Sequence, residues 1–296
     1  MRDSGSQRAG RNPRSVVKKL PSALLALGRS SPPKVIQVAG NEYRLAHLFK
    51  HDFFACTGLY VGPAGKVVLK LGRQADILGF PAQWIGRFLA AREAAAYQAL
   101  NDLESVPRFL GRWGSTGIVH EFIEGRPLRR DEPVPDEFFE RLTDAIETLH
   151  AREMAYVDLE KPQNVLVGDD GKPYLIDFQI AWHLPARFGG RTWLARWVRR
   201  RLQQGDCYHL LKLQRRIRRD QLTPEQIRRS YRKPFYVKIH AWLTSPLTKM
   251  RRRTLSRLDP SRKIGERGTL PDHGELYSTG AERQTKQNRE RERAVS

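Results

Sequence analysis

The stretch YVDLEKPQNVLVGDDGKPYLIDFQ, residues 156–179, constrains the fold of this 296-residue chain more than any other segment. Two short apolar runs, VLV and YLI, flank GDDGKP, whose Gly, Asp and Pro residues are typical of a turn. The pattern predicts a β-hairpin. Asp158 precedes the first run, Asn164 enters it and Asp177 leaves the second, so polar groups stand at the edges of the hairpin.

The rest of the chain divides into a strand-rich first half and a helix-rich second half. Apolar runs and turn residues predict two pairs of strands, at residues 43–71 and 106–125. Apolar residues at helical spacing predict helices at residues 81–100 and 136–154, and Asp136 is a possible N-cap of the second. With further helices toward the C-terminus, the order indicates an α+β fold.

Composition sets the expected domain limits. Both ends are rich in charged and small polar residues and poor in apolar ones, which predicts disorder. We expect a disordered arm over residues 1–35, a strand-rich lobe over 36–120, a helical lobe over 121–260 and a disordered tail over 261–296.

The net charge of +21 is concentrated in one segment. Residues 186–253 hold 20 Lys and Arg residues against 3 Asp and Glu, a net charge of +17. Such a segment predicts an anionic partner, which is nucleic acid, an acidic membrane surface or a phosphorylated substrate, with a solvated face as the alternative. Trp193, Leu194 and Trp197 share one helical face among arginines, the pattern of a helix lying on a membrane. Packing on the helical lobe and RNA binding are the alternatives.

Several classes of protein are disfavoured. No apolar run approaches the roughly 20 residues that cross a bilayer. Pro21 and Ser22 interrupt the apolar part of the N-terminal stretch, so a secretory signal is not expected. Cys56 and Cys207 are the only cysteines, and they form neither a metal cluster nor a disulfide framework. A reducing cytoplasm fits best.

The polar edges of the hairpin suit phosphoryl transfer. This reaction needs Mg²⁺ and a Lys at the phosphates, together with a carboxylate that orients the attacking hydroxyl. Magnesium prefers oxygen ligands, and Asn164 and Asp177 face each other across the hairpin turn. Asp158, just upstream, is placed to accept the proton of a hydroxyl.

A cation for this site is found upstream. Lys70 lies in the apolar run KVVLKL, where a buried ammonium group is costly unless it is paired. Glu93 follows 23 residues later in an alanine-rich helix that can approach the strand closely. We therefore expect an ion pair between Lys70 and Glu93.

These pieces resemble the protein-kinase-like superfamily over roughly residues 43–220. VVLK, the helix of Glu93, HEFIEG, VDLEKPQNVLV and LIDFQ occur in the order found in that family. The resemblance implies a two-lobed fold, with a strand-rich N-lobe and a helical C-lobe that here carries a basic C-terminal extension. It also implies the roles of individual residues: Lys70 at the ATP phosphates, Glu93 as its anchor, Asp158 as catalytic base, Asn164 and Asp177 as Mg²⁺ ligands, and the backbone around Glu121 and Ile123 at the adenine.

The chain also departs from the family pattern. Tyr156 and Val157 stand where protein kinases usually have His-Arg, and Gln179 replaces the Gly that follows Asp-Phe. One extra residue separates Asp158 from Asn164. The segment FKHDFFAC, where the nucleotide-covering loop is expected, has no Gly.

Losses of this kind are shared with atypical bacterial kinases that phosphorylate the lipopolysaccharide sugars heptose and Kdo. We therefore expect transfer of the ATP γ-phosphate to the hydroxyl of such a sugar, by a cytoplasmic protein at the inner membrane surface. A serine/threonine protein kinase is the alternative, because KPQN resembles those enzymes. A non-catalytic pseudokinase that binds membrane or RNA is a further alternative, because the glycines are missing.

Overall fold

The computed structural model describes residues 25–77, 80–130, 132–184, 189–190 and 192–232. The expected end of the helical lobe at residue 260, the tail over 261–296 and most of the N-terminal arm lie outside these residues. Within the described part, Ala26 and Leu27 are already buried, so the packed chain includes residues before 36.

The first lobe is built on a six-stranded antiparallel sheet with the order β1-β2-β3-β4-β6-β5. Its strands are β1 (Val35–Val38), β2 (Asn41–His51), β3 (Ala55–Gly62), β4 (Gly65–Gly72), β5 (Phe109–Trp113) and β6 (Gly117–Glu121). The turn GPAG joins β3 to β4 as the sequence predicts. Tyr60, Leu69 and Leu71 belong to an apolar cluster that Leu27 joins from the segment before β1.

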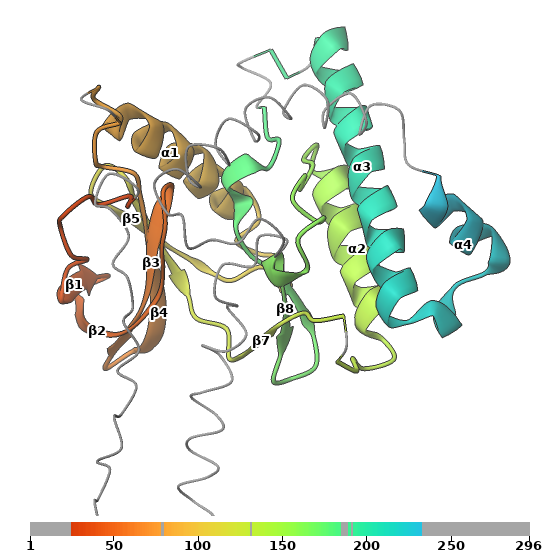
Figure 1. Cartoon of the computed structure of the whole chain (residues 1–296), viewed down its shortest axis with the longest axis horizontal. Helices are drawn as coiled ribbons and strands as arrows, with labels where there is room; N and C mark the ends of the chain where they lie inside the picture. Colours follow the sequence, from red (N-terminus) through yellow and green to blue (C-terminus); the bar gives the residue numbers. More distant parts are fainter. Residues whose placement is uncertain (1–24, 78–79, 131, 185–188, 191, 233–296) are drawn as a thin grey trace, which may run out of the picture.

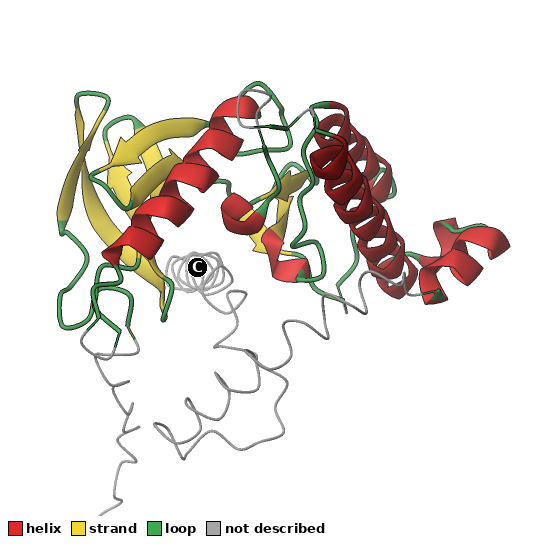
Figure 2. Cartoon of the chain, turned by 90° about the horizontal axis from the view of Figure 1, so that it is seen from above, coloured by secondary structure: helices red, strands yellow, loops and turns green. Residues whose placement is uncertain are grey.

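One helix, α1 (Gln83–Ala99), lies across this sheet (Figure 2). Ala90 and Ala94 are buried, and small side chains let the helix approach the strands closely. Gly86 is essential to this approach, because a Cβ atom there would overlap the carbonyl oxygen of Arg73. Arg92 donates from Nη2 to the carbonyl oxygen of Ala181 at 2.8 Å, so α1 also contacts the second lobe.

The second lobe is mostly helical (Figure 1). It contains α2 (Phe138–Ala151), α3 (Trp193–Ile217) and α4 (Pro224–Tyr231), the three-stranded sheet β7 (Gly125–Pro127), β8 (Val165–Gly168) and β9 (Pro173–Leu175), and the short 3-10 helices η2 (Pro162–Asn164), η3 (Phe178–Ile180) and η5 (Arg219–Gln221). The hairpin predicted at the start is β8–β9, paired from Val165↔Leu175 to Val167↔Pro173.

One boundary in this lobe differs from expectation. Asp136 is not the N-cap of α2, because Glu137 precedes the helix and no side chain caps it. The carboxylate of Asp136 instead accepts from Arg218 at 2.7 Å. The Asp136 carboxylate, which the sequence pattern assigns to a local N-cap, is therefore used in a long-range ion pair.

The expected α+β class and two-lobed architecture are confirmed. The strand-rich lobe and the helical lobe lie side by side, with α1 reaching from one to the other (Figures 1 and 2). The basic segment of residues 186–253 is described only in part, and residues 233–253 lie outside the described chain. In the described part of the chain, no helix has both the length and the apolar character that a bilayer crossing requires.

Candidate active site

Lys70 lies where the two lobes meet and contacts both of them. Its position in β4 places its Nζ atom 2.8 Å from Oε1 of Glu93 in α1 and 2.6 Å from Oδ1 of Asp177. Only 12% of the Lys70 side chain and 3% of the Glu93 side chain are exposed. The expected ion pair is present, and residues 107 positions apart are joined through one ammonium group.

Lys70 and Asp177 stabilise each other's charge, whereas burial weakens the charge of Glu93. Burial acts to lower the pKa of Lys70, but the carboxylates of Asp177 and Glu93 outweigh it and raise the pKa. Burial also acts to raise the pKa of Asp177, yet Lys70 holds it down at about 2. For Glu93, burial prevails over Lys70 and raises the pKa to about 7. Near neutral pH, Lys70 is therefore a cation and Asp177 is an anion.

Asp177 is presented by a strained turn. It stands immediately before η3 with a φ of 63°, in the left-handed region that residues other than glycine rarely adopt. Such strain persists only where the surroundings hold it, and it clusters at functional sites. The ion pair with Lys70 supplies one such restraint.

Asp158 and Asn164 form the other half of the site. Nδ2 of Asn164 donates to Oδ2 of Asp158 at 2.8 Å, and Nζ of Lys161 donates to the same oxygen at 2.6 Å. Both Asp158 and Asn164 are buried. Burial raises the pKa of Asp158, partly offset by Lys161, and the charge of Asp177 raises it further. The two carboxylates are therefore close enough to interact.

Asn164 and Asp177 are brought together by the hairpin backbone. The N–H of Ile176, the residue before Asp177, donates to the carbonyl oxygen of Asn164 at 3.0 Å. With its amide nitrogen bonded to Asp158, Asn164 has its amide oxygen left for a cation. A carboxylate and an amide oxygen are a donor set that fits Mg²⁺, which usually takes one or two protein carboxylates together with water and phosphate. The described residues hold no group of three or more His, Cys, Asp or Glu side chains suited to a metal ion.

Asp206 in α3 supports the loop that carries Asp158. Its Oδ2 accepts from the backbone N–H of Tyr156 at 2.8 Å, and its Oδ1 accepts from that of Val157 at 2.7 Å. Val157 has a φ of 72°, which is strained for a β-branched residue. His150 contacts Oδ2 of Asp206 at 3.0 Å. Asp206 is therefore a buried support for the backbone of this loop.

Tyr156 was not predicted to have a role. Its hydroxyl has one proton to donate and lies within hydrogen-bonding distance of two carbonyl oxygens, those of Ile176 and of Asn164, the latter at 3.1 Å. The ring is fully buried and packs edge-on against Phe178 at 5.2 Å. Tyr156 thus joins the Asp158 loop to the segment of Asp177. Its place two residues before Asp158 was the available signal, but sequence alone does not show where the hydroxyl points.

The two backbone positions expected at the adenine differ in whether their hydrogen-bonding groups are already used. The N–H of Glu121 donates to the carbonyl oxygen of Arg108 at 2.9 Å, and its own carbonyl oxygen lies 2.8 Å from Nδ1 of His120. The backbone of Ile123 makes no hydrogen bond to another described residue. Of the two, Ile123 has its backbone groups available to a ligand.

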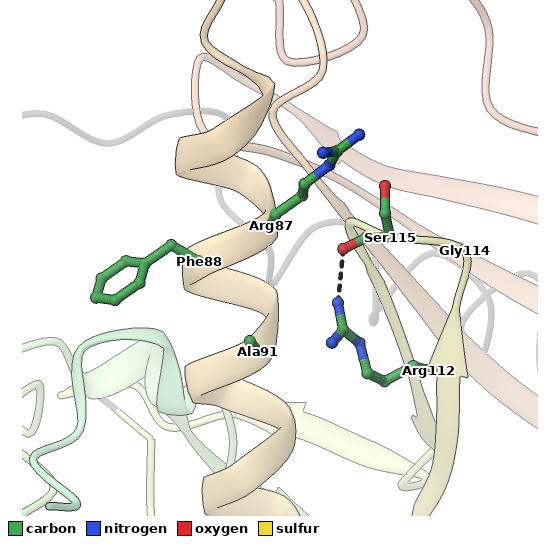
Figure 3. A pocket seen from close by; sticks show the side chains of 6 residues that line it. All are labelled: Arg87, Phe88, Ala91, Arg112, Gly114 and Ser115. Carbon is green, nitrogen blue, oxygen red and sulfur yellow. Dashed lines mark hydrogen bonds between the residues drawn. The ribbon is translucent and has the colours of Figure 1, made fainter. Parts of the chain in front are cut away.

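Two surface hollows lie outside the triad of Lys70, Glu93 and Asp177. One, of about 640 Å³, is lined by Arg87, Phe88, Ala91, Arg112, Gly114 and Ser115 (Figure 3). There Arg112 donates from Nη2 to the carbonyl oxygen of Ser115 at 2.6 Å. A second hollow, of about 280 Å³, includes Glu121 and Ile123 in its lining. Lys70, Asp158 and Asp177 line neither.

Solved structures similar to this chain include two of the Rio2 kinase from Chaetomium thermophilum. The complex of that kinase with ADP, Mg²⁺ and phosphoaspartate shares 17% sequence identity over 69% of this chain and 60% of that chain, with a TM-score of 0.47. Another structure of the same kinase shares 17% identity over 60% and 59% of the two chains, with a TM-score of 0.43. The chain thus spans about 60% of the length of these structures. No protein-family model and no curated protein matches it.

Proposed function

We propose that this protein is an ATP-dependent phosphotransferase that transfers the γ-phosphate of ATP to a hydroxyl group. The observation that carries the proposal is the buried Lys70 that joins Glu93 to Asp177. Phosphoryl transfer requires a Lys at the phosphates, a bound metal ion and a carboxylate that orients the nucleophile, and Lys70 stands between Glu93 and Asp177 as a candidate for the first. A purely structural ion pair accounts less well for the strained Asp177 and for the paired Asp158 and Asn164 beside it.

Each residue then has a defined task. Lys70, held by Glu93, contacts the phosphates, and the backbone of Ile123 is offered to the adenine. Asp177 and Asn164 would hold Mg²⁺, which neutralises charge on the phosphates when it is bound. Asp158 orients the acceptor hydroxyl and takes its proton as the oxygen–phosphorus bond forms and ADP leaves. The raised pKa of Asp158 favours this proton transfer.

For the acceptor we propose a lipopolysaccharide-type sugar reached at the inner membrane surface. The start of α3 supports this, because Trp193 and Trp197 are 73% and 51% exposed and Leu194 is exposed beside them. Arg200 and Arg201 are exposed on the same part of the helix. Aromatic rings with arginines suit the interface of an anionic membrane. In this proposal the protein is cytoplasmic and peripheral.

A Ser or Thr hydroxyl on a protein is the second candidate acceptor. It is favoured by the sequence KPQN, in which Lys161 contacts the proposed base directly. A pseudokinase that binds membrane or RNA is the non-enzymatic candidate. It is favoured by the segment between β2 and β3, which has no Gly to bring backbone N–H groups close to phosphates.

The test uses the full chain with labelled ATP and Mg²⁺. We expect transfer to an acceptor in fractionated cell extract, or slow ATP hydrolysis, and loss of both in Asp177→Ala. The matched control is Asp169→Ala, which removes an exposed carboxylate from the turn of the same hairpin. Equal activity of Asp177→Ala and the unmodified protein would contradict the assignment. Transfer to a lipid fraction or to a protein fraction separates the two acceptors, and no thermal stabilisation by millimolar Mg-ATP would favour the pseudokinase.

A further inference from the structure

The turn between β2 and β3 uses two of its backbone donors on one of its own side chains. The N–H groups of Phe54 and Ala55 both donate to Oδ1 of Asp52, each at 2.9 Å. Burial acts to raise the pKa of Asp52, but Lys50 and these two donors outweigh it and lower the pKa. Asp52 is therefore an anion near neutral pH, and it already takes N–H groups of the kind that can cradle a phosphate.

The turn is also held from outside. Nη1 of Arg73, which is 1% exposed, donates to the carbonyl oxygen of Phe53 at 2.8 Å. The guanidinium carbon of Arg73 lies 4.1 Å from the centroid of the Phe53 ring. These contacts keep the turn in the arrangement in which Asp52 holds its N–H groups. A side chain is then the better source of a donor for phosphate at this turn.

Lys50, at the end of β2, is such a side chain. Its Nζ atom lies 2.6 Å from Oδ2 of Asp52, and the two side chains are 30% and 15% exposed. Lys70 is held in the same manner, because its Nζ atom contacts Glu93, whose side chain is more deeply buried than its own. The sheet therefore carries two lysines, each positioned by a carboxylate.

The register of the sheet places the two lysines in one row. Lys50 is opposite Thr57 in β3, and Thr57 is opposite Lys70 in β4. Residues directly opposite each other have their side chains on the same face, and two strand spacings put the Cα atoms of the lysines about 10 Å apart. The irregularity of β2 comes before Lys50, and the next pair, His51 with Cys56, continues the register. Cys56 belongs to the apolar cluster on the other face, so Lys50 shares the face on which Lys70 meets its carboxylates.

The charge of Lys50 also acts on Asp177. Burial acts to raise the pKa of Asp177, and Lys70 first, then Lys161 and Lys50, act to lower it. This agrees with the shared row of Lys50 and Lys70. An ammonium group has three donors, so Lys50 can keep its bond to Asp52 while it donates to a phosphate oxygen.

We propose that Lys50 is a second phosphate-binding cation of the site, which contacts the triphosphate of Mg-ATP beside Lys70. It takes the place of the glycine backbone that this turn lacks. The inference rests on the proposed phosphotransferase function, because it assigns a further residue to the same nucleotide. Asp52 then has the task of holding Lys50 in position before the nucleotide binds.

The experiment measures binding of Mg-ATP to the full chain by calorimetry, with adenosine as the comparison that has no phosphate. Lys50→Met should weaken binding of Mg-ATP by about tenfold or more, the size of one lost charge-assisted hydrogen bond. Binding of adenosine should change less than twofold, and Lys50→Arg should recover most of the binding of Mg-ATP. The matched control is Arg44→Met, because Arg44 pairs with Glu42, also two residues away, near the other end of β2. It should change binding of Mg-ATP less than twofold, as expected for an exposed ion pair.

A double variant separates contact with phosphate from neutralisation of Asp52. Lys50→Met leaves the Asp52 carboxylate without this cation, and that charge by itself repels phosphates. Lys50→Met combined with Asp52→Asn removes both charges, and Asn keeps an oxygen for the N–H groups of Phe54 and Ala55. Binding of Mg-ATP that stays weak in the double variant supports the contact. Recovery of binding to the level of the unmodified protein would overturn it.

The outcomes also separate this inference from the proposed function. Equal binding of Mg-ATP by Lys50→Met and the unmodified protein, or an equal loss of adenosine binding, would overturn the inference while labelled-ATP transfer could still stand. An unmodified protein that does not bind Mg-ATP would overturn both. If a melt without ligand shows that Lys50→Met is unfolded, Lys50→Gln, which keeps a donor for Asp52 without the charge, carries the same expectations.

Discussion

Asp206→Asn is expected to be among the most damaging single changes in the second lobe. Asp206 is 1% exposed and uses both carboxylate oxygens on the backbone before Asp158. Asn keeps the shape but offers only one acceptor oxygen, and its amide nitrogen would face an N–H donor. It also leaves His150 without its anionic partner.

The size of the effect follows from these contacts. One buried N–H left without an acceptor costs about 1–3 kcal/mol, and breaking a buried ion pair adds to this. Val157 adds to the expected loss of stability. A positive φ at a β-branched residue is strained, and it persists only while the hydrogen bond of Val157 holds it. We expect the free energy of unfolding to fall by about 3–5 kcal/mol.

A pH series provides a second measurement. Burial acts to lower the pKa of His150, but its contacts with Asp206 and Cys207 raise it to about 9. The raised pKa means that the added stability is fully present below about pH 6.5 and is lost as the pH rises through about 9. Urea unfolding of the unmodified protein should show this decline, of about 2 kcal/mol after screening by solvent. Asp206→Asn should lack it.

Two results would refute this reasoning. One is a loss of less than about 1 kcal/mol in Asp206→Asn, well below the cost of an unsatisfied buried donor. The other is an unchanged pH dependence between pH 6.5 and 9 in that variant. Asp220→Asn is the control, because it removes an exposed carboxylate from the short helix that follows α3, and it should leave both measurements nearly unchanged.

The remaining predictions concern backbone strain, close packing of α1 and the positioning of Lys70. Val157→Gly should stabilise the protein by about 1 kcal/mol in urea unfolding, because Gly adopts a positive φ without strain; a loss of stability would show that the Val side chain matters more. Gly86→Ala should lower stability by about 1–3 kcal/mol, because the new methyl group overlaps the backbone of Arg73, and an unchanged melting curve would contradict the close packing of α1. Glu93→Gln should weaken Mg-ATP binding in a thermal-shift titration, because Lys70 loses one of its two carboxylates; equal binding would mean that Glu93 does not position Lys70.

The sequence predicted the elements whose pattern is local. The hairpin β8–β9 and the turn between β3 and β4 follow from short apolar runs separated by Gly, Asp and Pro. Helix α1 follows from its alanine-rich periodicity. The N-cap of α2 was wrong, because Asp136 is taken by Arg218 from a distant part of the chain, and no local pattern contains that information.

The contacts of the candidate site also fall into two groups, those that could be predicted from the sequence and those made between distant segments. A Lys in an apolar strand must find a partner, so the pairing of Lys70 with Glu93 could be predicted from the cost of burial. The contact of Lys70 with Asp177 and the bonds of the Tyr156 hydroxyl depend on how the lobes and the two hairpin edges meet. Such contacts between distant segments cannot be obtained from spacing alone.

The extra residue between Asp158 and Asn164 shows how a departure in sequence can leave a site intact. The chain absorbs it in two successive turns, since the N–H of Lys161 donates to the carbonyl oxygen of Asp158 and that of Asn164 donates to Lys161. Asn164 still reaches the Asp158 carboxylate at 2.8 Å. In the same loop, Lys161 donates to the Asp158 carboxylate and Glu160 accepts from Lys212 of α3. The loop with the extra residue therefore pairs Asn164 with Asp158 and also contacts α3 through Glu160 and Lys212.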